Sequence, residues 1–484
     1  MPTELKSLHE KFDEATTSEN VWKAPNLKEV LNLKPVDPVY YTEEGESDNL
    51  DSYCDSKEMG DNIEDNIPEL VIPDEDICTM ANPYRRALNN KVLGRKVATK
   101  LTSTMGQNII CFYLLLLVGA VAASPQHVNC PFHYLYHFGD GFTDVGNSIH
   151  VPSRTPNPAA RLPYGRSSPG WPTGRWSDGL NDFDFAATDF GLPHLAPYLS
   201  MNASENYDGV IFSVARSPVL DINFFKSRGI KIPSYAAVPL NAQLRWFKNY
   251  FNSTFSSPKE RANRMENSFL FLGDIEGNDI GYALTQGKSI EEVQTYVPLI
   301  TRAQIRVARE LIRMGATRLI IPGNAPLGCF PYILSALPSN NSTDYDELGC
   351  LKSVNDLVVS KNDYLQQAIR NLNLEFPNII INYGPIYDGA YEVIRDASYG
   401  PNGELALLAC CGTGGKYNYD GKKFCGSPQV PVCRYPNQYI FWDGIHFTHH
   451  AYSRMETILI EPALRTLGCT RSVNSTTSNL SASA

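Results

Sequence analysis

The strongest constraint on the fold is an alternation of short apolar runs with longer amphipathic stretches between residues 130 and 469. Such an alternation is typical of an α/β domain, in which helices connect neighbouring strands of a parallel sheet. The stretch 289–315 begins with a capping box of Ser289 and Glu292 and ends on a glycine, which predicts a helix. We expect strands at residues 134–138, 210–214, 269–272, 319–322 and 379–382, and further helices at 351–376 and 452–467.

Residues 1–104 have a different composition, with 21 acidic and 12 basic side chains. The other 380 residues carry a net charge of only −1. A segment this acidic buries too little apolar surface to offset the conformational entropy that it would lose on folding. We therefore expect residues 1–104 to be a disordered leader. A stretch added by a wrong start codon would look the same. We expect the domain itself at residues 124–470, followed by a polar tail at 471–484.

Composition also limits the classes of function. The nearly neutral main body offers no basic face to a phosphate backbone, so we expect no nucleic-acid partner. Hydrophobic residues make up 43% of the chain, which is enough for a sizeable core and excludes disorder throughout.

Residues 105–123 have the pattern of a secretory signal peptide. Their apolar run follows a basic stretch and closes on small residues at Ala120 and Ala122. It is short for a membrane span and suits the apolar core of a signal peptide. We therefore expect a secreted glycoprotein, with the vacuole as the alternative destination and membrane contact only if this segment stays uncleaved. The glycosylation acceptors all lie downstream, at Asn202, Asn252, Asn340, Asn341, Asn474 and Asn479.

Eight of the 11 cysteines lie after residue 123. An even number suits disulfide pairing in a secretory compartment, although eight cysteines permit many connectivities. We expect Cys329 and Cys350 to close one local loop. Four others could also be read as a zinc site, but no CxxC pair or nearby histidine supports that, and we expect no metal and no cofactor. These four are Cys410, Cys411, Cys425 and Cys433.

Two short motifs mark where chemistry is expected. Residues 138–147 read Phe-Gly-Asp-Gly-Phe-Thr-Asp-Val-Gly-Asn, directly after the first expected strand, and residues 441–448 read Phe-Trp-Asp-Gly-Ile-His-Phe-Thr. With landmarks at 172–175, 209–221, 277–279 and 326–329, this order resembles the plant GDSL esterase/lipase family, a branch of the SGNH hydrolases. The resemblance implies a flavodoxin-like, three-layer α/β/α sandwich around a mainly parallel five-stranded sheet.

The resemblance also implies a catalytic site. In the family, a serine after the first strand attacks an ester carbonyl, and a histidine held by an aspartate moves its proton. Asp443 and His446 match that pair. Backbone amides and an asparagine side chain hold the oxyanion, and Asn278, which follows Gly277, matches the asparagine. Asp140 precedes the position of the serine.

Three positions depart from the family pattern. Gly141 stands where the Gly-Asp-Ser motif has its nucleophile, and it has no side-chain oxygen. Arg216 replaces the oxyanion glycine, and Glu276 replaces the glycine that begins the third block. We therefore expect no acyl-enzyme and no efficient serine-esterase activity. Because Arg216 and Glu276 carry opposite charges, we expect them to lie within salt-bridge reach and to fill part of the site.

Three functions remain open from the sequence. The first is a degenerate family member that binds a small acylated metabolite or ester, or a secreted protein partner. The second is an enzyme of non-covalent acid/base chemistry, in which Asp443 orients His446 and Glu276 is a second acid or base. The third is a residual ester hydrolase or acyltransferase, in which His446 activates water in the space left by Gly141.

Overall fold

The computed structural model describes residues 128–471, except for 154–155, 193–194, 202–206 and 274–275. The predicted leader, signal-like segment and tail beyond residue 471 lie outside these residues. Among the described acceptors for glycosylation, Asn252, Asn340 and Asn341 are exposed. No described helix is both long enough and apolar enough to cross a membrane.

Within the described residues, a sheet of six parallel strands runs in the order β3-β4-β2-β5-β6-β7. All five predicted strands are present, as β2 (Tyr134–Phe138), β4 (Gly209–Ile211), β5 (Ser268–Leu272), β6 (Arg318–Pro322) and β7 (Ile380–Gly384). The predicted count of five was one too few, because β3 (Ala196–Pro197) also pairs at the edge. Two residues that include a proline give no strand pattern in a sequence, and an edge strand accommodates a proline readily. A separate antiparallel pair joins β1 (Val128–Asn129) to β8 (Thr470–Arg471).

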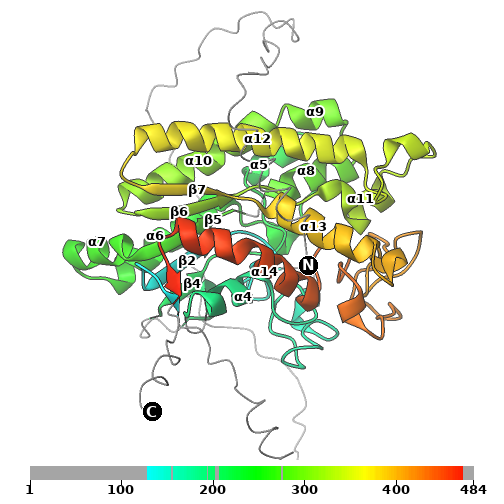
Figure 1. The fold of residues 1–484 in the computed structure, drawn as a ribbon, viewed down its shortest axis with the longest axis horizontal. Helices are drawn as coiled ribbons and strands as arrows, with labels where there is room; N and C mark the ends of the chain where they lie inside the picture. Colours follow the sequence, from blue (N-terminus) through cyan, green and yellow to red (C-terminus); the bar gives the residue numbers. More distant parts are fainter. Residues whose placement is uncertain (1–127, 154–155, 193–194, 202–206, 274–275, 472–484) are drawn as a thin grey trace, which may run out of the picture. The chain divides into compact units, whose positions relative to one another are not determined.

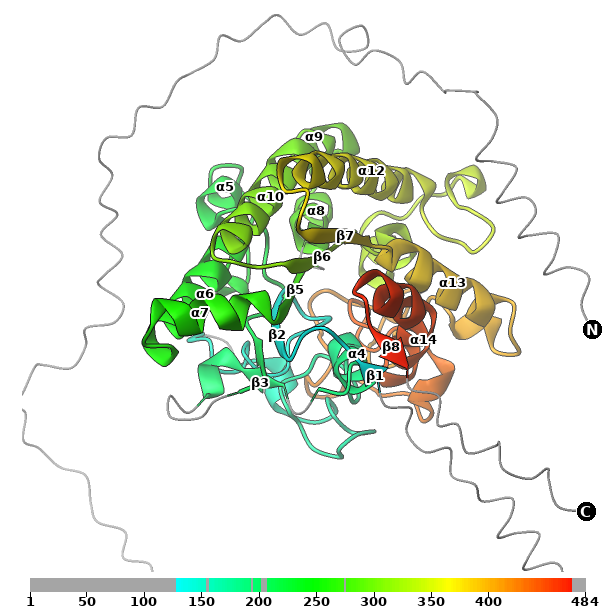
Figure 2. The same ribbon diagram turned by 60° about the vertical axis from the view of Figure 1, so that its left-hand side comes forward.

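Helices cover both faces of the sheet, which confirms the three-layer sandwich. Figures 1 and 2 show α10 and α12 on one side of the strands and α4 and α14 on the other. Alternate residues of each strand serve the two cores, as β-strand geometry requires: Tyr136 and Leu270 face one core, and Leu135 and Phe269 face the other. The helices are α4 (Asp182–Asp189), α5 (Ile222–Lys226), α6 (Leu240–Thr254), α7 (Pro258–Glu266), α8 (Glu276–Thr285), α9 (Ile290–Gln294), α10 (Val297–Arg313), α11 (Pro331–Ala336), α12 (Lys352–Glu375), α13 (Ile386–Ser398) and α14 (His449–Thr466).

The predicted helix at 289–315 is two helices, α9 and α10. Ser289 caps α9 by accepting a hydrogen bond from the Glu292 backbone, as its position in the capping box predicts. Pro298, in the first turn of α10, has no N–H to continue the helical ladder from α9, and this position favours a new helix start. The other two predicted helices are α12 and α14, each within a few residues of its predicted bounds.

All eight cysteines after residue 123 form disulfides, and the predicted bond between Cys329 and Cys350 is among them. Cys130 and Cys469 join the two ends of the described chain. The four cysteines that could be read as a zinc site pair instead as Cys410 with Cys433 and Cys411 with Cys425.

Candidate active site

The turn that follows β2 is held tightly in place. The Gln243 side chain donates to the carbonyl oxygen of Gly139 and accepts from its N–H, at 2.9 and 3.0 Å. The Gly273 N–H, directly after β5, donates to the carbonyl of Phe138 at 3.1 Å. Asp140 accepts from the Phe142 N–H at 3.1 Å, which closes the turn around residue 141. The backbone that would present a nucleophile is therefore preserved although the serine is absent.

His446 and Asp443 form a buried, hydrogen-bonded pair. The Nδ1 of His446 lies 2.9 Å from Asp443 Oδ2, and only 2% of the His446 side chain is exposed. Because a carboxylate accepts and does not donate, Nδ1 carries the proton and Nε2 is directed away from Asp443. Burial acts to raise the pKa of Asp443, but the charge and hydrogen bonds of His446 and a bond from Tyr164 outweigh it and lower that pKa. The carboxylate is thus held ionised beside the imidazole.

The loop that carries this pair is fixed by its neighbours. The backbone N–H groups of Cys410 and Cys411 donate to the carbonyls of Phe441 and Trp442, at 2.9 and 2.7 Å. Both cysteines are disulfide-bonded, so a cross-linked segment supports the strand-like stretch that leads to Asp443. The cysteine cluster therefore helps to fix the position of the Asp443 loop.

Two aromatic residues complete the surroundings of the pair, and neither was predicted from the sequence. The hydroxyl of Tyr164 donates to Asp443 Oδ2 at 2.8 Å, and Trp176 lies against the imidazole with ring centroids 5.1 Å apart. Both are almost fully buried. The only signal for Trp176 in the sequence is its place directly after the Pro-Thr-Gly-Arg landmark, and Tyr164 has none.

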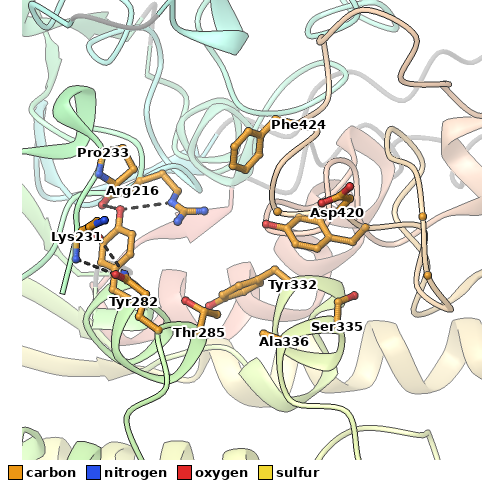
Figure 3. A pocket seen from close by; sticks show the side chains of 15 residues that line it. Arg216, Lys231, Pro233, Tyr282, Thr285, Tyr332, Ser335, Ala336, Asp420 and Phe424 are labelled. Carbon is orange, nitrogen blue, oxygen red and sulfur yellow. Dashed lines mark hydrogen bonds between the residues drawn. The ribbon is translucent and has the colours of Figure 1, made fainter. Parts of the chain in front are cut away.

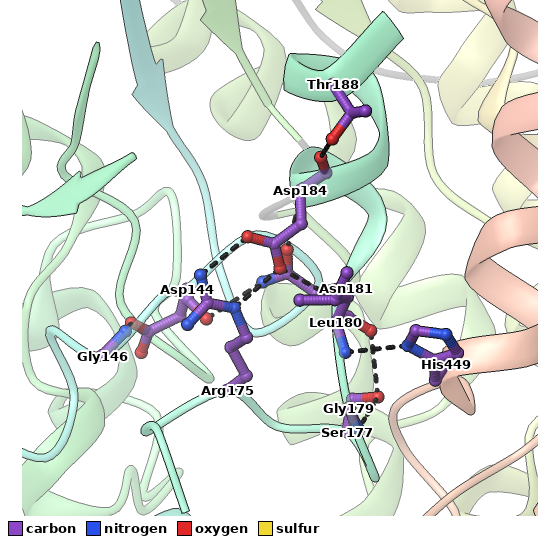
Figure 4. A network of polar contacts seen from close by, with 10 residues as sticks. All are labelled: Asp144, Gly146, Arg175, Ser177, Gly179, Leu180, Asn181, Asp184, Thr188 and His449. Carbon is purple, nitrogen blue, oxygen red and sulfur yellow. Dashed lines mark hydrogen bonds and ion pairs between the residues drawn. The ribbon is translucent and has the colours of Figure 1, made fainter. Parts of the chain in front are cut away.

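A polar network connects that landmark to the start of α14. Arg175 makes two hydrogen bonds of 2.7 Å with the carboxylate of Asp184, in the first turn of α4 (Figure 4). The nearby Leu180 N–H donates to His449 Nδ1 at 3.0 Å, and the His449 N–H donates to Asp178 at 2.7 Å. The segment with Trp176 and the segment with His446 are therefore held by the same contacts.

Gly141 lies directly against the imidazole of His446. A Cβ atom built on Gly141 would come within 2.2 Å of His446 Nε2 and 2.6 Å of its Cδ2. Both distances are far below van der Waals contact, so any side chain at residue 141 would require the ring to move. The imidazole occupies the space that a serine side chain would need.

No neighbouring hydroxyl replaces the serine. Thr143 donates to Ser213 Oγ at 3.0 Å, and Ser148 accepts from the Trp176 indole N–H at 2.9 Å. Among the described contacts of Thr143 and Ser148 there is no hydrogen bond to His446, and both side chains are fully buried.

On the side of the site that would stabilise an oxyanion, the asparagine side chain is already engaged. Asn278 is the asparagine predicted for this role, and its side-chain amide donates to Asp140 and to the Ser217 carbonyl. These two bonds use both N–H groups of the amide. The Ala215 N–H, just before Arg216, donates to Asp144 at 2.9 Å. Gly277 lies beside Asn278 in α8 and is only partly buried.

Arg216 keeps a backbone conformation that suits glycine. Its φ of 66° lies in the left-handed region, where most side chains are strained. Its guanidinium lies over the ring of Tyr282, 5.1 Å from the centroid, and Tyr282 donates to the Arg216 carbonyl at 2.7 Å. The predicted partner, Glu276, begins α8, but its side chain lies outside the described residues, so the salt bridge stays a prediction.

A cavity of about 530 Å³ opens beside Arg216. Figure 3 shows the guanidinium extending among the lining residues, between Tyr282 and Phe424. The lining also holds two further phenols, Tyr332 and Tyr419, and one acid, Asp420. His446, Asp443 and Gly141 are not among the lining residues. Arg216, Lys231 and three tyrosines thus supply much of the polar lining of this cavity, while Asp443 and His446 are buried and do not line it.

The arrangement can bind, but it has few means to transfer an acyl group. It offers two cations, Arg216 and Lys231, several hydroxyl groups and an oriented base, but residue 141 supplies no side-chain oxygen to that base. No group of three or more His, Cys, Asp or Glu side chains within the described part of the chain could hold a metal ion.

Comparison of the sequence with known proteins matches one family. The family model described as GDSL-like Lipase/Acylhydrolase matches residues 135–457. Acetylajmalan esterase 2 of Rauvolfia serpentina is 42% identical over 361 residues, covering 74% of this chain and 97% of that protein. Acetylajmalan esterase of the same plant is 43% identical, covering 75% and 92%. Sinapine esterase of Brassica napus is 33% identical, covering 73% and 92%.

Proposed function

The chain belongs to the GDSL-like lipase/acylhydrolase family, and from that premise we propose that it binds a small acylated ligand without forming an acyl-enzyme. Its relatives are hydrolases of ester bonds, so an ester or acylated metabolite is the ligand class to expect. The observation that carries the proposal is the contact between Gly141 and His446. A site whose base fills the place of the nucleophile is suited to recognition and not to covalent turnover.

The cavity supports the choice of ligand. Arg216 and the phenols of Tyr332 and Tyr419 are donors that match the carbonyl and alkoxy oxygens of an ester. Two of the relatives are named for acetylajmalan, and we propose an acetyl ester of comparable size as the ligand. A volume of about 530 Å³ falls in the range of cavities that hold small organic molecules.

Two features argue against hydrolysis. Removal of the nucleophile from a hydrolase triad typically costs about 10⁶ in turnover, and the rest of the rate comes from binding and the oxyanion hole. Here the Asn278 amide already spends both N–H groups on protein acceptors. An oxyanion would have to displace one of them, so little of that remaining rate is expected.

The catalytic part of the proposal is tested by esterase assays on p-nitrophenyl acetate. We expect the native protein and His446→Ala to hydrolyse it at the same slow rate. Gly141→Ser together with Arg216→Gly is the matched gain-of-function variant, since it supplies an oxygen and a glycine at the family positions. Activity of the native protein that disappears in His446→Ala would overturn the proposal and favour water activated by His446.

The binding part is tested by thermal unfolding in the presence of acetylajmalan. A ligand that binds only the folded chain raises the unfolding midpoint as its concentration increases. We expect this shift for the native protein and a smaller one for Tyr419→Phe, which loses one donor in the cavity. No shift at millimolar ligand, with a specific protein recovered by affinity capture from secretory fractions, would favour the protein-partner alternative.

Secretion is part of the same proposal. Four disulfides and exposed glycosylation acceptors support a secretory compartment, because disulfides persist under oxidising conditions. We propose cleavage at the end of residues 105–123. Sequencing the mature N-terminus tests this: Ala123 or Ser124 is the expected first residue, and an intact Met1 would contradict it.

A further inference from the structure

A second cavity lies away from the residues described above, against the face of the sheet that α4 and α14 cover. Its volume is about 190 Å³, and most of its wall is apolar. Four phenylalanine rings, Phe183, Phe190, Phe269 and Phe271, belong to that wall. An apolar cavity of about this size is large enough to hold a small aromatic molecule.

Two carboxyl groups interrupt this apolar wall. Asp182, in the first turn of α4, and Glu456, in α14, both line the cavity and are only 4% and 6% exposed. The Oδ1 atom of Asp182 has no hydrogen-bond partner among the described residues. Within the described residues, neither carboxyl group forms an ion pair. A buried carboxylate without a partner is costly, so each group favours its protonated form unless a cation compensates its charge.

The charges around this pair are also negative. Burial first, and then the charge of Asp184, raises the pKa of Asp182 to about 7. Burial, followed by the charges of Asp182 and Asp189, raises the pKa of Glu456 well above its usual range. The nearby cation Arg175 is already bound by Asp184 in a two-bond ion pair. Near neutral pH the two carboxyl groups are therefore at least partly protonated and carry fewer than two negative charges between them. A single bound cation would balance that charge.

The aromatic wall has the same preference. The face of a phenyl ring carries partial negative charge, so it attracts cations and repels carboxylates. Phe183 and Phe271 lie 5.4 Å apart by centroid, and Phe190 and Phe269 also 5.4 Å apart. Rings and carboxyl groups together form surroundings that suit an organic cation better than water or an anion.

We propose that this second cavity binds a small organic monocation, a primary ammonium group on an aryl or alkyl body. The ammonium group would donate to the free Oδ1 of Asp182 and to the carboxyl of Glu456. Its apolar body would pack among the phenylalanine rings. This site is independent of the proposed ester-binding cavity, because no residue lines both.

The test is calorimetric titration of the full chain with 2-phenylethylamine at neutral pH, beside 2-phenylethanol as the neutral analogue. We expect the amine to bind at least about tenfold more tightly than the alcohol, the loss expected when a charged hydrogen bond is removed. Asp182→Asn and Glu456→Gln should each reduce amine affinity by about the same factor and leave the alcohol nearly unaffected. Ala186→Leu, which narrows the cavity, should weaken both ligands.

Two control variants locate the site and exclude a general effect of charge. Asp420→Asn removes the acid of the first cavity, and Glu392→Gln removes an exposed acid on α13; neither should change amine affinity. Circular dichroism establishes that each variant is folded, and Glu456→Gln provides a second variant if Asp182→Asn does not fold. Equal affinity for amine and alcohol, or loss of amine binding in Asp420→Asn, would overturn the proposal.

Discussion

The two halves of the candidate active site match the expected family pattern to very different extents. Around His446 and Asp443, polar and aromatic contacts hold the imidazole, with Tyr164 on the carboxylate and Trp176 against the ring. Glycine stands at residue 141, where that pattern predicts a nucleophile, and arginine stands at residue 216, where it predicts a glycine. The acid–base half is ordered, and we propose that the half that would meet the ester carbonyl has been rebuilt.

The two halves are held in place by different means. The acid–base half is held by the backbone of its own loop, by cross-linked cysteines and by buried aromatic rings, so its geometry does not depend on a bound substrate. In the other half, we propose that the missing side chains would act only in catalysis. The imidazole fills the space beside Gly141, and the ordered base is part of the packing.

The largest expected effect follows from removing the carboxylate of the ordered half. Asp443→Ala would leave the N–H groups of Ile445 and His446, the imidazole and the Tyr164 hydroxyl without their acceptor. At about 1 kcal/mol for each buried donor, we expect a loss of about 4 kcal/mol in the free energy of unfolding, measured with urea. Asp396→Ala, which breaks an exposed ion pair with Arg454, is the control and should cost less than about 1 kcal/mol.

A smaller effect should appear where the two halves touch. Gly141→Ala places a methyl group in the space of His446 Nε2, and we expect overpacking to cost about 2 kcal/mol. In the background of His446→Ala the same change should cost close to nothing. The double-mutant cycle thus measures the contact itself. Equal costs in both backgrounds would mean that the imidazole does not occupy the space of the missing side chain.

Much of the fold could be predicted because it depends on local patterns. β2 was predicted at its observed bounds, since Tyr134–Phe138 is an apolar run that ends on glycine. The capping box placed the start of α9 correctly, but the amphipathic pattern runs through residues 295–296 and concealed the break before α10. β3 was missed because two residues carry no periodicity, and only its pairing with β4 makes it a strand.

The site could be predicted less completely, for a physical reason. Asp443 and His446 are three residues apart in one motif, so their contact was predictable. Tyr164 reaches Asp443 across 279 positions of sequence, and no local pattern encodes such a distance. The contact of Gly141 with the imidazole was not predicted either, because the sequence shows a missing oxygen but not what fills its space.

The ordered half should also respond to acid. The pKa of Asp443 is lowered in the folded chain, so its contribution to stability is complete above the unfolded value, near 3.8, and is lost as the pH falls further. We expect the native protein to lose stability relative to Asp443→Asn below about pH 4. Urea unfolding of both proteins at several pH values measures the difference. A constant difference from pH 6 to pH 3 would show that the carboxylate gains nothing from its surroundings.

The smallest expected effect is a difference in stability between two variants of Arg216, in the rebuilt half. It separates the contribution of the backbone conformation from that of the side chain. Arg216→Ala and Arg216→Gly both remove the guanidinium from the Tyr282 ring, but only glycine adopts a φ of 66° without strain. We expect the glycine variant to be more stable by about 0.5–1 kcal/mol, because the left-handed strain of alanine outweighs the extra entropy of glycine in the unfolded chain. Alanine equal to or above glycine would mean that the backbone relaxes once the arginine is gone. The left-handed turn would then be a consequence of the contact between Arg216 and Tyr282, and not a conformation inherited from a glycine.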